Sequence, residues 1–345
     1  MSEDARRVLV YRLGSLGDTV VSLPCLHLVA RSFPRAERRL LTNEPMGGKA
    51  ASVELVLGGS GLVSGTAIRY PAGIRNPATL FRLRREIRAF DPDLLVYLTE
   101  SRGVGAALRD MAFFRTCGIA RILGAPLSND LATHRYLARE KRWEREAERL
   151  ARCLAPLGDA LLDKRESWDL GFSAAERARA DAALSGWAGA GNFAVFSVGT
   201  KWPENDWGDA RWSQALAALS AASHGLGLVL TGSADEAGRS DALAIHWKGP
   251  VLNLCGRLPP RESALVIARA RLFLGHDSGP MHLAAAVGTP AVAVFSRKNK
   301  PGIWFPCGPG HTPLYPAEGA AIEPAMLVAA ARDTLMRRAG AESQA

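Results

Sequence analysis

The chain has 345 residues, of which 48% are hydrophobic and 22% charged, and its formal net charge is +9. The length favours two globular domains, and the absence of any apolar run of about 18 residues argues against a membrane-spanning helix. Five scattered cysteines without a CxxC pair argue against a disulfide framework or a zinc site. This cysteine usage favours a reducing cytoplasm, and the N-terminus has no signal-peptide pattern.

The first half of the chain alternates strand-like and helix-like patterns, which predicts a parallel sheet in an α/β layer. Strands are expected at Arg7–Leu13, Glu37–Thr42 and Asp93–Leu98, and helices at Asp18–Arg31, Pro77–Phe90 and Glu140–Leu154. A domain boundary is expected at about 165–192, where Ser173 and Glu176 have the spacing of a capping box at a helix start.

The second half repeats this rhythm more clearly. Strands are expected at Phe193–Val198, Leu226–Thr231, Val251–Cys255, Leu272–Gly275 and Pro290–Phe295, and helices at Asp209–Ser223, Glu236–Trp247, Arg261–Ala270 and Glu323–Arg338. A further helix is expected between the last two strands. Two α/β domains of this kind place ligands at the carboxyl ends of their strands.

The positive charge lies in the first half. Residues 1–155 hold 25 Lys and Arg against 16 Asp and Glu, whereas residues 156–345 hold 18 of each class. This excess fits an acidic partner such as a phosphorylated lipid, an anionic membrane surface or nucleic acid. It fits a solvated, arginine-rich surface equally well.

The most informative motif is Asp277-Ser-Gly-Pro-Met-His282, between a buried strand and a helix. Free N–H groups and the positive end of the helix dipole meet near Ser278 and Gly279, and phosphate is the commonest guest of such a helix start. His282 is expected to point from the same helix end. The motif therefore predicts a site for a phosphorylated ligand.

A second motif, Gly14-Ser-Leu-Gly-Asp18, follows the first strand. Its glycines permit a tight turn, but their spacing is not the dinucleotide fingerprint, which argues against a dehydrogenase. Asp18 is either a helix cap or a carboxylate at the ligand edge that acts as a general base.

Two further segments follow strands of the second half. Thr200 and Lys201 are placed where a phosphate-binding cation is expected, although a plain surface lysine is the alternative. Asp235 or Glu236 can accept hydrogen bonds from ribose hydroxyls or cap a helix, and Glu236 is the preferred candidate.

Taken together, these motifs resemble glycosyltransferase family 9, the heptosyltransferase family of bacterial lipopolysaccharide synthesis. The resemblance covers the whole chain. The residues that carry it are Gly14-Ser-Leu-Gly-Asp18, Lys201-Trp-Pro203, Leu254-Cys-Gly256, and Asp277-Ser-Gly-Pro-Met-His282 with Gly288-Thr-Pro290.

The resemblance implies the GT-B architecture, in which two Rossmann-like parallel-sheet domains face a cleft. Residues 1–175 would bind the acceptor and residues 190–322 the nucleotide-sugar. The C-terminal helix within 323–345 would pack back on the N-terminal domain.

The resemblance also implies a role for each motif. Asp18 would be the catalytic base, beside the turn glycines Gly14 and Gly17 near the acceptor. The donor would be bound by Thr200, Lys201, Glu236, Asp277, Ser278, Gly279 and His282, with Lys201 and the turn at 277–279 on its diphosphate and Glu236 on its ribose.

The implied reaction is an inverting transfer of a sugar, with ADP-heptose as the first donor to consider, to a lipopolysaccharide-core or related glycan. No cofactor and no metal are expected. Asp91-Pro-Asp93 has the spacing of a metal-binding pair, but it directly precedes a strand and is interpreted as a strand-entry turn.

The basic first domain then fits a phosphorylated glycolipid or glycan acceptor and an anionic membrane surface, and not nucleic acid. A cytoplasmic protein, peripheral on the inner face of the inner membrane, is expected. Alternatives are a nucleotide-sugar-modifying enzyme such as a 2-epimerase, or a non-catalytic nucleotide-sugar-binding protein. The chain departs from the family pattern at Trp202 and in the basic loop 296–302, where Arg297, Lys298 and Lys300 either contact further phosphate or form a solvated loop, the latter being slightly favoured.

Overall fold

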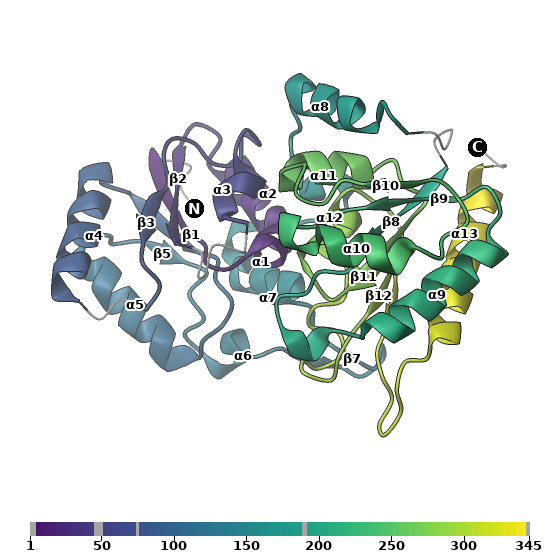
Figure 1. Cartoon of the computed structure of the whole chain (residues 1–345). Helices are drawn as coiled ribbons and strands as arrows, with labels where there is room; N and C mark the ends of the chain where they lie inside the picture. The colour runs from purple at the N-terminus through teal and green to yellow at the C-terminus, as the bar shows by residue number, and fades with distance from the viewer. Residues whose placement is uncertain (1–4, 45–50, 74–75, 188–191, 343–345) are drawn as a thin grey trace. The chain divides into compact units, whose positions relative to one another are not determined.

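A computed structural model describes residues 5–44, 51–73, 76–187 and 192–342. The chain forms two compact units, Met1–Gly171 and Phe172–Ala345 (Figure 1). The predicted domain limit at residue 190 lies outside the described residues. Within the described ranges, no helix combines the length and the apolar character that a membrane span requires.

The first unit is built on a five-stranded parallel sheet with the strand order β3-β2-β1-β4-β5. The strands are β1 (Arg7–Tyr11), β2 (Glu37–Asn43), β3 (Ile68–Tyr70), β4 (Leu94–Tyr97) and β5 (Ile122–Leu123). The helices are α1 (Leu16–Val20), α2 (Leu23–Ser32), α3 (Val53–Leu57), α4 (Pro77–Phe90), α5 (Val104–Thr116), α6 (Asn129–Ala132) and α7 (Glu146–Cys153), and a short antiparallel pair is formed by β6 (Tyr136–Leu137) and β7 (Arg142–Trp143).

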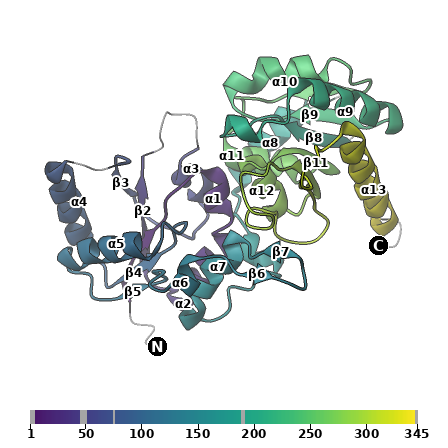
Figure 2. The same cartoon turned by 90° about the horizontal axis from the view of Figure 1, so that it is seen from below.

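The central strands β1 and β4 are apolar and buried along nearly their whole length, as expected for parallel strands covered on both faces. Leu83 and Ile87 of α4 and Phe114 of α5 pack on the face that contains Leu9 and Leu95. Figures 1 and 2 show α4 and α5 side by side on this unit. The amphipathic helix predicted at Pro77–Phe90 has the same bounds in the structure.

Two predicted helices of the first unit differ from the structure. The helix expected at Asp18–Arg31 is divided into α1 and α2, because Pro24 cannot continue a helix and instead occupies the first turn of α2. The helix expected at Glu140–Leu154 begins only at Glu146, because β7 pairs with β6 before it.

The second unit has a six-stranded parallel sheet with the order β10-β9-β8-β11-β12-β13. The strands are β8 (Phe193–Ser197), β9 (Gly227–Leu230), β10 (Val251–Asn253), β11 (Leu272–His276), β12 (Ala291–Val294) and β13 (Thr312–Leu314). The helices are α8 (Ala174–Leu184), α9 (Asp209–Ala222), α10 (Ala237–Ala244), α11 (Pro260–Ile267), α12 (Gly279–Ala286) and α13 (Pro324–Glu342).

The predicted capping box at the start of α8 is confirmed. Ser173 Oγ accepts from the Glu176 N–H at 3.2 Å, and Glu176 Oε2 accepts from the Ser173 N–H at 2.7 Å. Glu176 also pairs with Arg261 of α11, which lowers the pKa of the Glu176 carboxyl to about 2. This ion pair holds α8 against α11, and α8 belongs to the second unit. The sequence predicted a first domain that extends to residue 175, whereas the first compact unit ends at Gly171.

The last helix, α13, packs within the second unit. It contacts α9 and the β11–β13 side of the sheet, and Leu327 and Ala331 are buried in the same core as Trp212. Figure 2 shows α9 beside both α10 and α13. The structure thus assigns α13 to the second unit, where its apolar face finds a core, and a contact with the first unit stays a prediction.

This core gives a direct test of packing. Leu216 of α9 is 0% exposed, so Leu216→Ala is expected to lower the free energy of unfolding by about 2–5 kcal/mol through lost burial and a residual cavity. Ile245, which is 74% exposed, is the matched control. Ile245→Ala is expected to change the free energy of unfolding by less than about 0.5 kcal/mol. Urea denaturation followed by circular dichroism measures both, and equal losses would contradict the assignment of this core.

Candidate active site

The strand order of each sheet reverses at one point, between β1 and β4 in the first unit and between β8 and β11 in the second. Open α/β sheets bind ligands outside the carboxyl ends of their strands at such a point. The segments that leave these strands carry Asp18, Glu100, Lys201 and Asp277. The predicted residues Asp18, Lys201 and Asp277 therefore lie at the edge of each sheet where a ligand is expected, together with Glu100.

Asp18 is held at the start of α1. Its Oδ2 accepts hydrogen bonds from the Ser15 N–H at 2.7 Å and from Ser15 Oγ–H at 2.9 Å. Among the described residues no hydrogen bond reaches its Oδ1. The carboxylate is thus a capping group through one oxygen, and this capping leaves its second oxygen available, so the general-base interpretation of Asp18 stays a prediction that is compatible with the cap.

Gly14 is required by this arrangement. Its φ is +112°, and a Cβ at this position would lie 2.6 Å from Cγ and Oδ2 of Asp18. A side chain would therefore both strain the backbone and displace the carboxylate. Gly17, in contrast, lies inside α1 without a positive φ, so the structure gives it no comparable role.

Two charged residues near Asp18 did not emerge from the sequence. Arg12 is fully buried, and its Nη1 donates to Leu98 O at 2.6 Å, while Nε and Nη2 have no hydrogen-bond partner among the described residues. Burial lowers the pKa of Arg12, and the nearby carboxylates of Asp18, Glu146 and Glu100 oppose this shift.

Glu100 follows β4 at the same sheet edge. Glu100 is exposed at the surface, but partial desolvation by neighbouring groups, and then the negative charges of Asp18 and Glu146, raise the pKa of its carboxyl. A carboxyl group with a raised pKa beside a second carboxylate is typical of functional sites. Its position three residues after the end of a buried strand was the sequence signal that could have identified Glu100.

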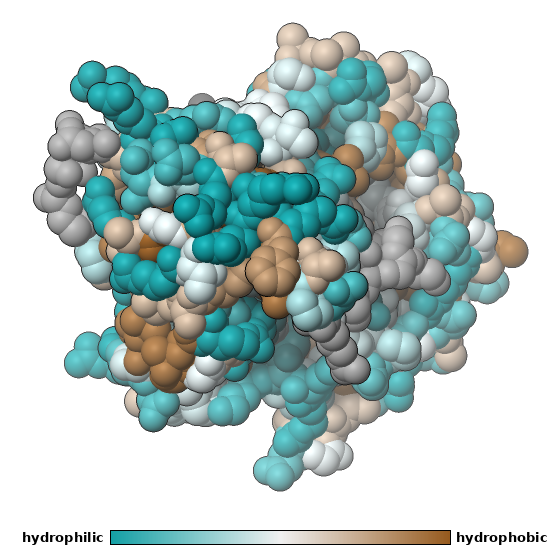
Figure 3. Space-filling model, turned by 90° about the vertical axis from the view of Figure 1, so that its left-hand side faces the viewer, coloured by the Kyte–Doolittle hydropathy of each residue, from teal (hydrophilic) through white to brown (hydrophobic). Residues whose placement is uncertain are grey.

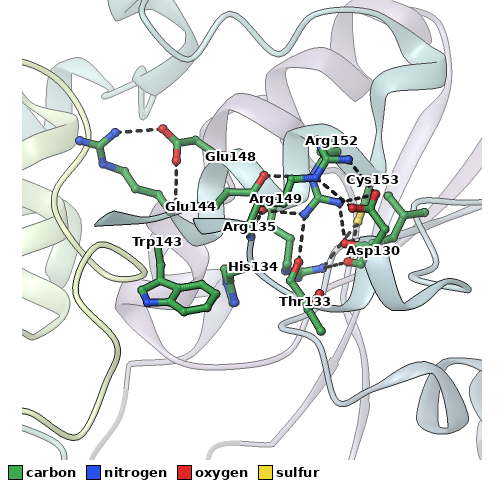
Figure 4. Close-up of polar contacts among 12 residues, drawn as sticks. Asp130, Thr133, His134, Arg135, Trp143, Glu144, Glu148, Arg149, Arg152 and Cys153 are labelled. Carbon is green, nitrogen blue, oxygen red and sulfur yellow. Dashed lines mark hydrogen bonds and ion pairs between the residues drawn. The ribbon is translucent and has the colours of Figure 1, made fainter. Parts of the chain in front are cut away.

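Figure 4 shows polar contacts among α6, the β6–β7 hairpin and α7, including the pairs of Arg152 with Glu144 and Asp130. Residues of α7 also brace the loop that leaves β4. The buried Arg149 of α7 donates to both carboxylate oxygens of Glu146 and, through Nη2, to Thr99 O at 3.0 Å. His134 Nε2 lies 2.9 Å from Glu146 Oε2. Because Thr99 immediately precedes Glu100, α7 fixes the backbone of this part of the site.

The acidic pair near β4 is structural. Asp93 Oδ2 accepts from the N–H groups of Arg6 and Arg7 at 2.7 and 2.9 Å, and Asp91 pairs with the Arg7 side chain at 2.6 Å. Both carboxylates thus organise the entry to β1 and β4, as the sequence predicted.

In the second unit, Lys201 lies beside the basic loop 296–302. The indole ring of Trp202 has Lys298 Nζ at 3.8 Å from its centroid and Lys201 Nζ at 5.3 Å. Asn299 Nδ2 donates to Asp277 Oδ2 at 3.3 Å. The two departures from the family pattern therefore contact each other through Lys298 and Trp202. Arg297, Lys298 and Lys300 are all exposed, so a contact of these cations with further phosphate stays a prediction beside the solvated loop.

The start of α12 has the predicted form. Ser278 is the N-cap with an extended backbone, but its side chain does not cap the helix, and Gly279 is the first helical residue. Ser278 Oγ donates to His276 O at 3.3 Å. His282 is buried and its ring packs edge-on against Trp304 at 6.1 Å between centroids, so its contact with the donor stays a prediction.

Glu236 lies close to the Lys201 segment. Its Oε2 accepts from the Ser233 N–H at 2.9 Å, as in a helix cap. A Cβ on Gly199 would lie 2.3 Å from Glu236 Oε1, and one on Gly232 would lie 2.1 Å from Oε2. The carboxylate therefore rests on the backbone just before Thr200, and only glycines permit this approach.

His276, at the end of β11, was missed by sequence reasoning. Its Nδ1 donates to Val198 O at 3.0 Å, and its Nε2 accepts from Trp207 N–H at 2.9 Å and from Trp212 Nε1–H at 3.1 Å. The ring is therefore neutral, and burial lowers its pKa to about 4. This residue ties the end of β8 to the end of β11.

The comparison with protein-family models decides the family. The model described as glycosyltransferase family 9 (heptosyltransferase) matches residues 120–321, which is more than half of the chain. The chain belongs to glycosyltransferase family 9. The matched range contains every residue of the second-unit site described above.

Two relatives extend this result. Lipopolysaccharide heptosyltransferase 1 of Pseudomonas aeruginosa is 26% identical over 332 residues, which cover 88% of this chain and 85% of the relative. Lipopolysaccharide heptosyltransferase 3 of Escherichia coli is 33% identical over 99 residues. That match spans 27% of this chain and only 28% of the relative's length.

Several solved structures share the fold of this protein. A family 9 glycosyl transferase from Veillonella parvula aligns with a TM-score of 0.72 and 17% identity, over 96% of this chain and 98% of that one. The E. coli ADP-heptose lps heptosyltransferase II aligns with a TM-score of 0.67 and 19% identity, over 96% of this chain and 99% of that one. The UDP-GlcNAc 2-epimerase from Methanocaldococcus jannaschii aligns with a TM-score of 0.53 and 10% identity, over 95% of this chain and 92% of that one. The fold class predicted from the sequence is confirmed, and it is shared by enzymes of more than one kind.

His276 predicts a pH dependence of stability. The folded protein keeps this imidazole neutral down to about pH 4, whereas the unfolded chain binds the proton near the ordinary value of 6.5. The unfolded state therefore binds more protons between these values, and the free energy of unfolding falls as the pH is lowered from 6.5 to 4. At about 1.4 kcal/mol per pKa unit, the loss due to His276 is on the order of 3 kcal/mol.

His276→Gln is expected to remove this part of the pH dependence, measured by urea denaturation at several pH values. His224→Gln, which changes an exposed histidine of the same unit, is the control and is expected to keep the wild-type slope. A His276→Gln slope equal to that of the wild type would contradict the neutral, buried role of His276.

Proposed function

We propose that this protein is an inverting, metal-independent glycosyltransferase. It moves a sugar from a nucleotide-sugar, with ADP-heptose as the first donor to test, to a lipopolysaccharide-core or related phosphorylated glycan. The observation that carries the proposal is the placement of the Asp18 motif and the Lys201–Asp277 motifs at the strand-order reversals of two sheets, in a chain of family 9. The names of the E. coli and Pseudomonas relatives support the donor and the pathway.

The second unit supplies the donor site in this proposal. A departing nucleoside diphosphate carries negative charge that must be stabilised. Lys201 and the N–H groups at the start of α12 provide positive electrostatic potential, and Lys298 adds a further cation beside Trp202. Glu236, whose carboxylate lies against Gly199, would accept hydrogen bonds from ribose hydroxyls. No metal is assigned because these groups supply the required charge.

The first unit supplies the base. In an inverting transfer, a carboxylate removes the proton from the acceptor hydroxyl as that oxygen attacks the anomeric carbon and the diphosphate leaves. Asp18 suits this role because Ser15 fixes Oδ2 and leaves Oδ1 for the acceptor. Glu100 and Arg12 set the electrostatic surroundings of that carboxylate.

We also propose that the protein works in the cytoplasm, peripheral to the inner face of the inner membrane. The positive charge of residues 1–155 supports attraction to anionic lipid. On α4, Leu80 and Phe81 are exposed beside the exposed Arg82 and Arg85. In the face shown in Figure 3, hydrophilic surface surrounds separate hydrophobic areas, which suits reversible contact more than insertion.

A 2-epimerase is the second candidate, and the shared fold with the Methanocaldococcus enzyme is the observation in its favour. An epimerase acts on the nucleotide-sugar alone and has no acceptor. Turnover of donor without any acceptor would therefore support it. Tight donor binding without turnover would support a non-catalytic binding protein.

Asp18→Asn tests the proposal. Loss of the base is expected to lower kcat for sugar transfer about 10²- to 10⁴-fold, with the Kd for ADP unchanged because the donor site lies in the other unit. Asp163→Asn, which changes an exposed acid of the first unit, is the matched control and is expected to retain wild-type transfer. Near-wild-type turnover by Asp18→Asn would remove Asp18 as the base.

A further inference from the structure

Three tyrosines end three strands of the first-unit sheet. Tyr11, Tyr70 and Tyr97 are the last residues of β1, β3 and β4. Tyr11 and Tyr97 are partners in the strand register, with their rings edge-on at 5.2 Å, and the hydroxyls of Tyr11 and Tyr70 are 2.9 Å apart. A set of hydroxyl groups thus gathers at the carboxyl edge of the sheet, beside the reversal of strand order.

The buried Asp110 of α5 organises this edge. Its Oδ2 accepts from Tyr97 Oη–H at 2.9 Å and from Arg102 Nη2 at 2.5 Å. Its Oδ1 accepts from Nε and Nη2 of Arg109 at 3.2 and 2.9 Å. One carboxylate therefore serves two arginines, and one positive charge is left over.

The tyrosines do not neutralise this charge. Burial raises the pKa of Tyr11 and raises that of Tyr70 to about 12, so both phenols are neutral near pH 7. The surplus positive charge therefore remains on the two guanidinium groups.

Arg102 is fixed on one side only. Its Nη2 lies 3.2 Å from Tyr97 Oη, 3.4 Å from Tyr11 Oη and 2.5 Å from Asp110. Among the described residues, its Nε and Nη1 make no hydrogen bond, and the side chain is 39% exposed. The guanidinium group is thus held in place with donors still directed to solvent.

The chain also fixes the backbone that carries Arg102. Ser101 Oγ accepts from the Gly103 N–H at 3.3 Å, and Arg149 binds Thr99 O just before this loop. A guanidinium group held in one orientation loses little entropy when it binds an oxyanion, and its planar donors match the geometry of a carboxylate or phosphate. A surface arginine without these supports would not have this advantage.

We propose that Arg102, with Arg109 as a second cation on the same carboxylate, forms an oxyanion subsite of the first unit that binds a phosphate or carboxylate group of the acceptor glycan. The inference rests on the proposed transferase function for the identity of the ligand. The subsite distinguishes acceptors that carry an anionic group from those that lack one. The transferred hydroxyl is positioned by Asp18 and not by this subsite.

The first experiment does not depend on transfer. In ¹⁵N NMR of the whole chain, the Nε–Hε signal of Arg102, assigned by its loss in Arg102→Gln, is followed during titration with inorganic phosphate and, separately, with acetate. A saturable shift in at least one titration is expected, and the stronger response identifies phosphate or carboxylate as the preferred group. The exposed Arg121 of the same unit is the control signal. An Arg102 signal that moves no more than that of Arg121 in either titration would overturn the subsite.

The second experiment uses transfer to an acidic acceptor, to its phosphatase-treated form and to its carboxyl-reduced form. Arg102→Gln is expected to raise the acceptor KM roughly 10- to 100-fold with kcat and the donor KM unchanged, because one charge-assisted pair is lost. The variant is also expected to lose the wild-type preference for one acidic group over its neutralised form. Arg121→Gln is expected to behave as the wild type.

A variant that keeps the wild-type preference would overturn the subsite. Should Arg102→Gln fail to fold, Arg102→Lys retains a positive charge beside Asp110, and its KM is compared for the acidic acceptor and for the neutralised forms in the same way. An equal change in KM for the acidic and neutralised acceptors would then count against the proposal. Absence of transfer by the wild type would instead refute the proposed function, and the NMR titration would still decide the subsite.

Discussion

The functional groups of both units depend on one constraint of parallel sheets, which is that all strands end at the same edge. A helix must return the chain to the opposite edge before the next strand, so residues far apart in sequence meet where strands finish. In the first unit this brings the segment after β1, with Asp18, beside the segment after β4, with Glu100 and Arg102. In the second it brings the segment after β8, with Lys201, to the same edge as the segment after β11, with Asp277. The central reversal of strand order leaves room there for a ligand.

The two units stabilise this edge by different means. In the second unit, the neutral ring of His276 joins the ends of β8 and β11 through hydrogen bonds. In the first unit, ion pairs hold the segments at this edge: Arg149 pairs with Glu146, and both are buried, while the partly exposed Arg102 pairs with the buried Asp110. Breaking a buried pair by removing one partner typically costs about 3–5 kcal/mol, because the other charge is left uncompensated. In the first unit this cost applies to Arg149 and Glu146, whose side chains are both buried.

Much of the fold could be predicted from the sequence, because parallel strands and amphipathic helices have clear periodicities. The bounds of α4 and the turn at Asp277 followed from such local signals. The hairpin of β6 and β7 did not, since its charged residues also suit a helix and only pairing across the turn decides between them. The cluster of Tyr11, Tyr97 and Asp110 could not be predicted either, because these residues come into contact only when α5 packs on the sheet. Sequence reasoning found residues that act through local backbone geometry and missed those that act through tertiary contacts.

Gly14 has a consequence for genetics. Its backbone lies in a region that other residues rarely adopt, and the position that a side chain would occupy is already filled by the carboxylate of Asp18. A missense allele at codon 14 would therefore disturb the same chemical group as an allele at codon 18, without altering that group's identity. Substitutions at Gly14 and at Asp18 are therefore expected to give the same defect. Second-site mutations that compensate for a side chain at position 14 would have to enlarge the turn, because the carboxylate itself is still present.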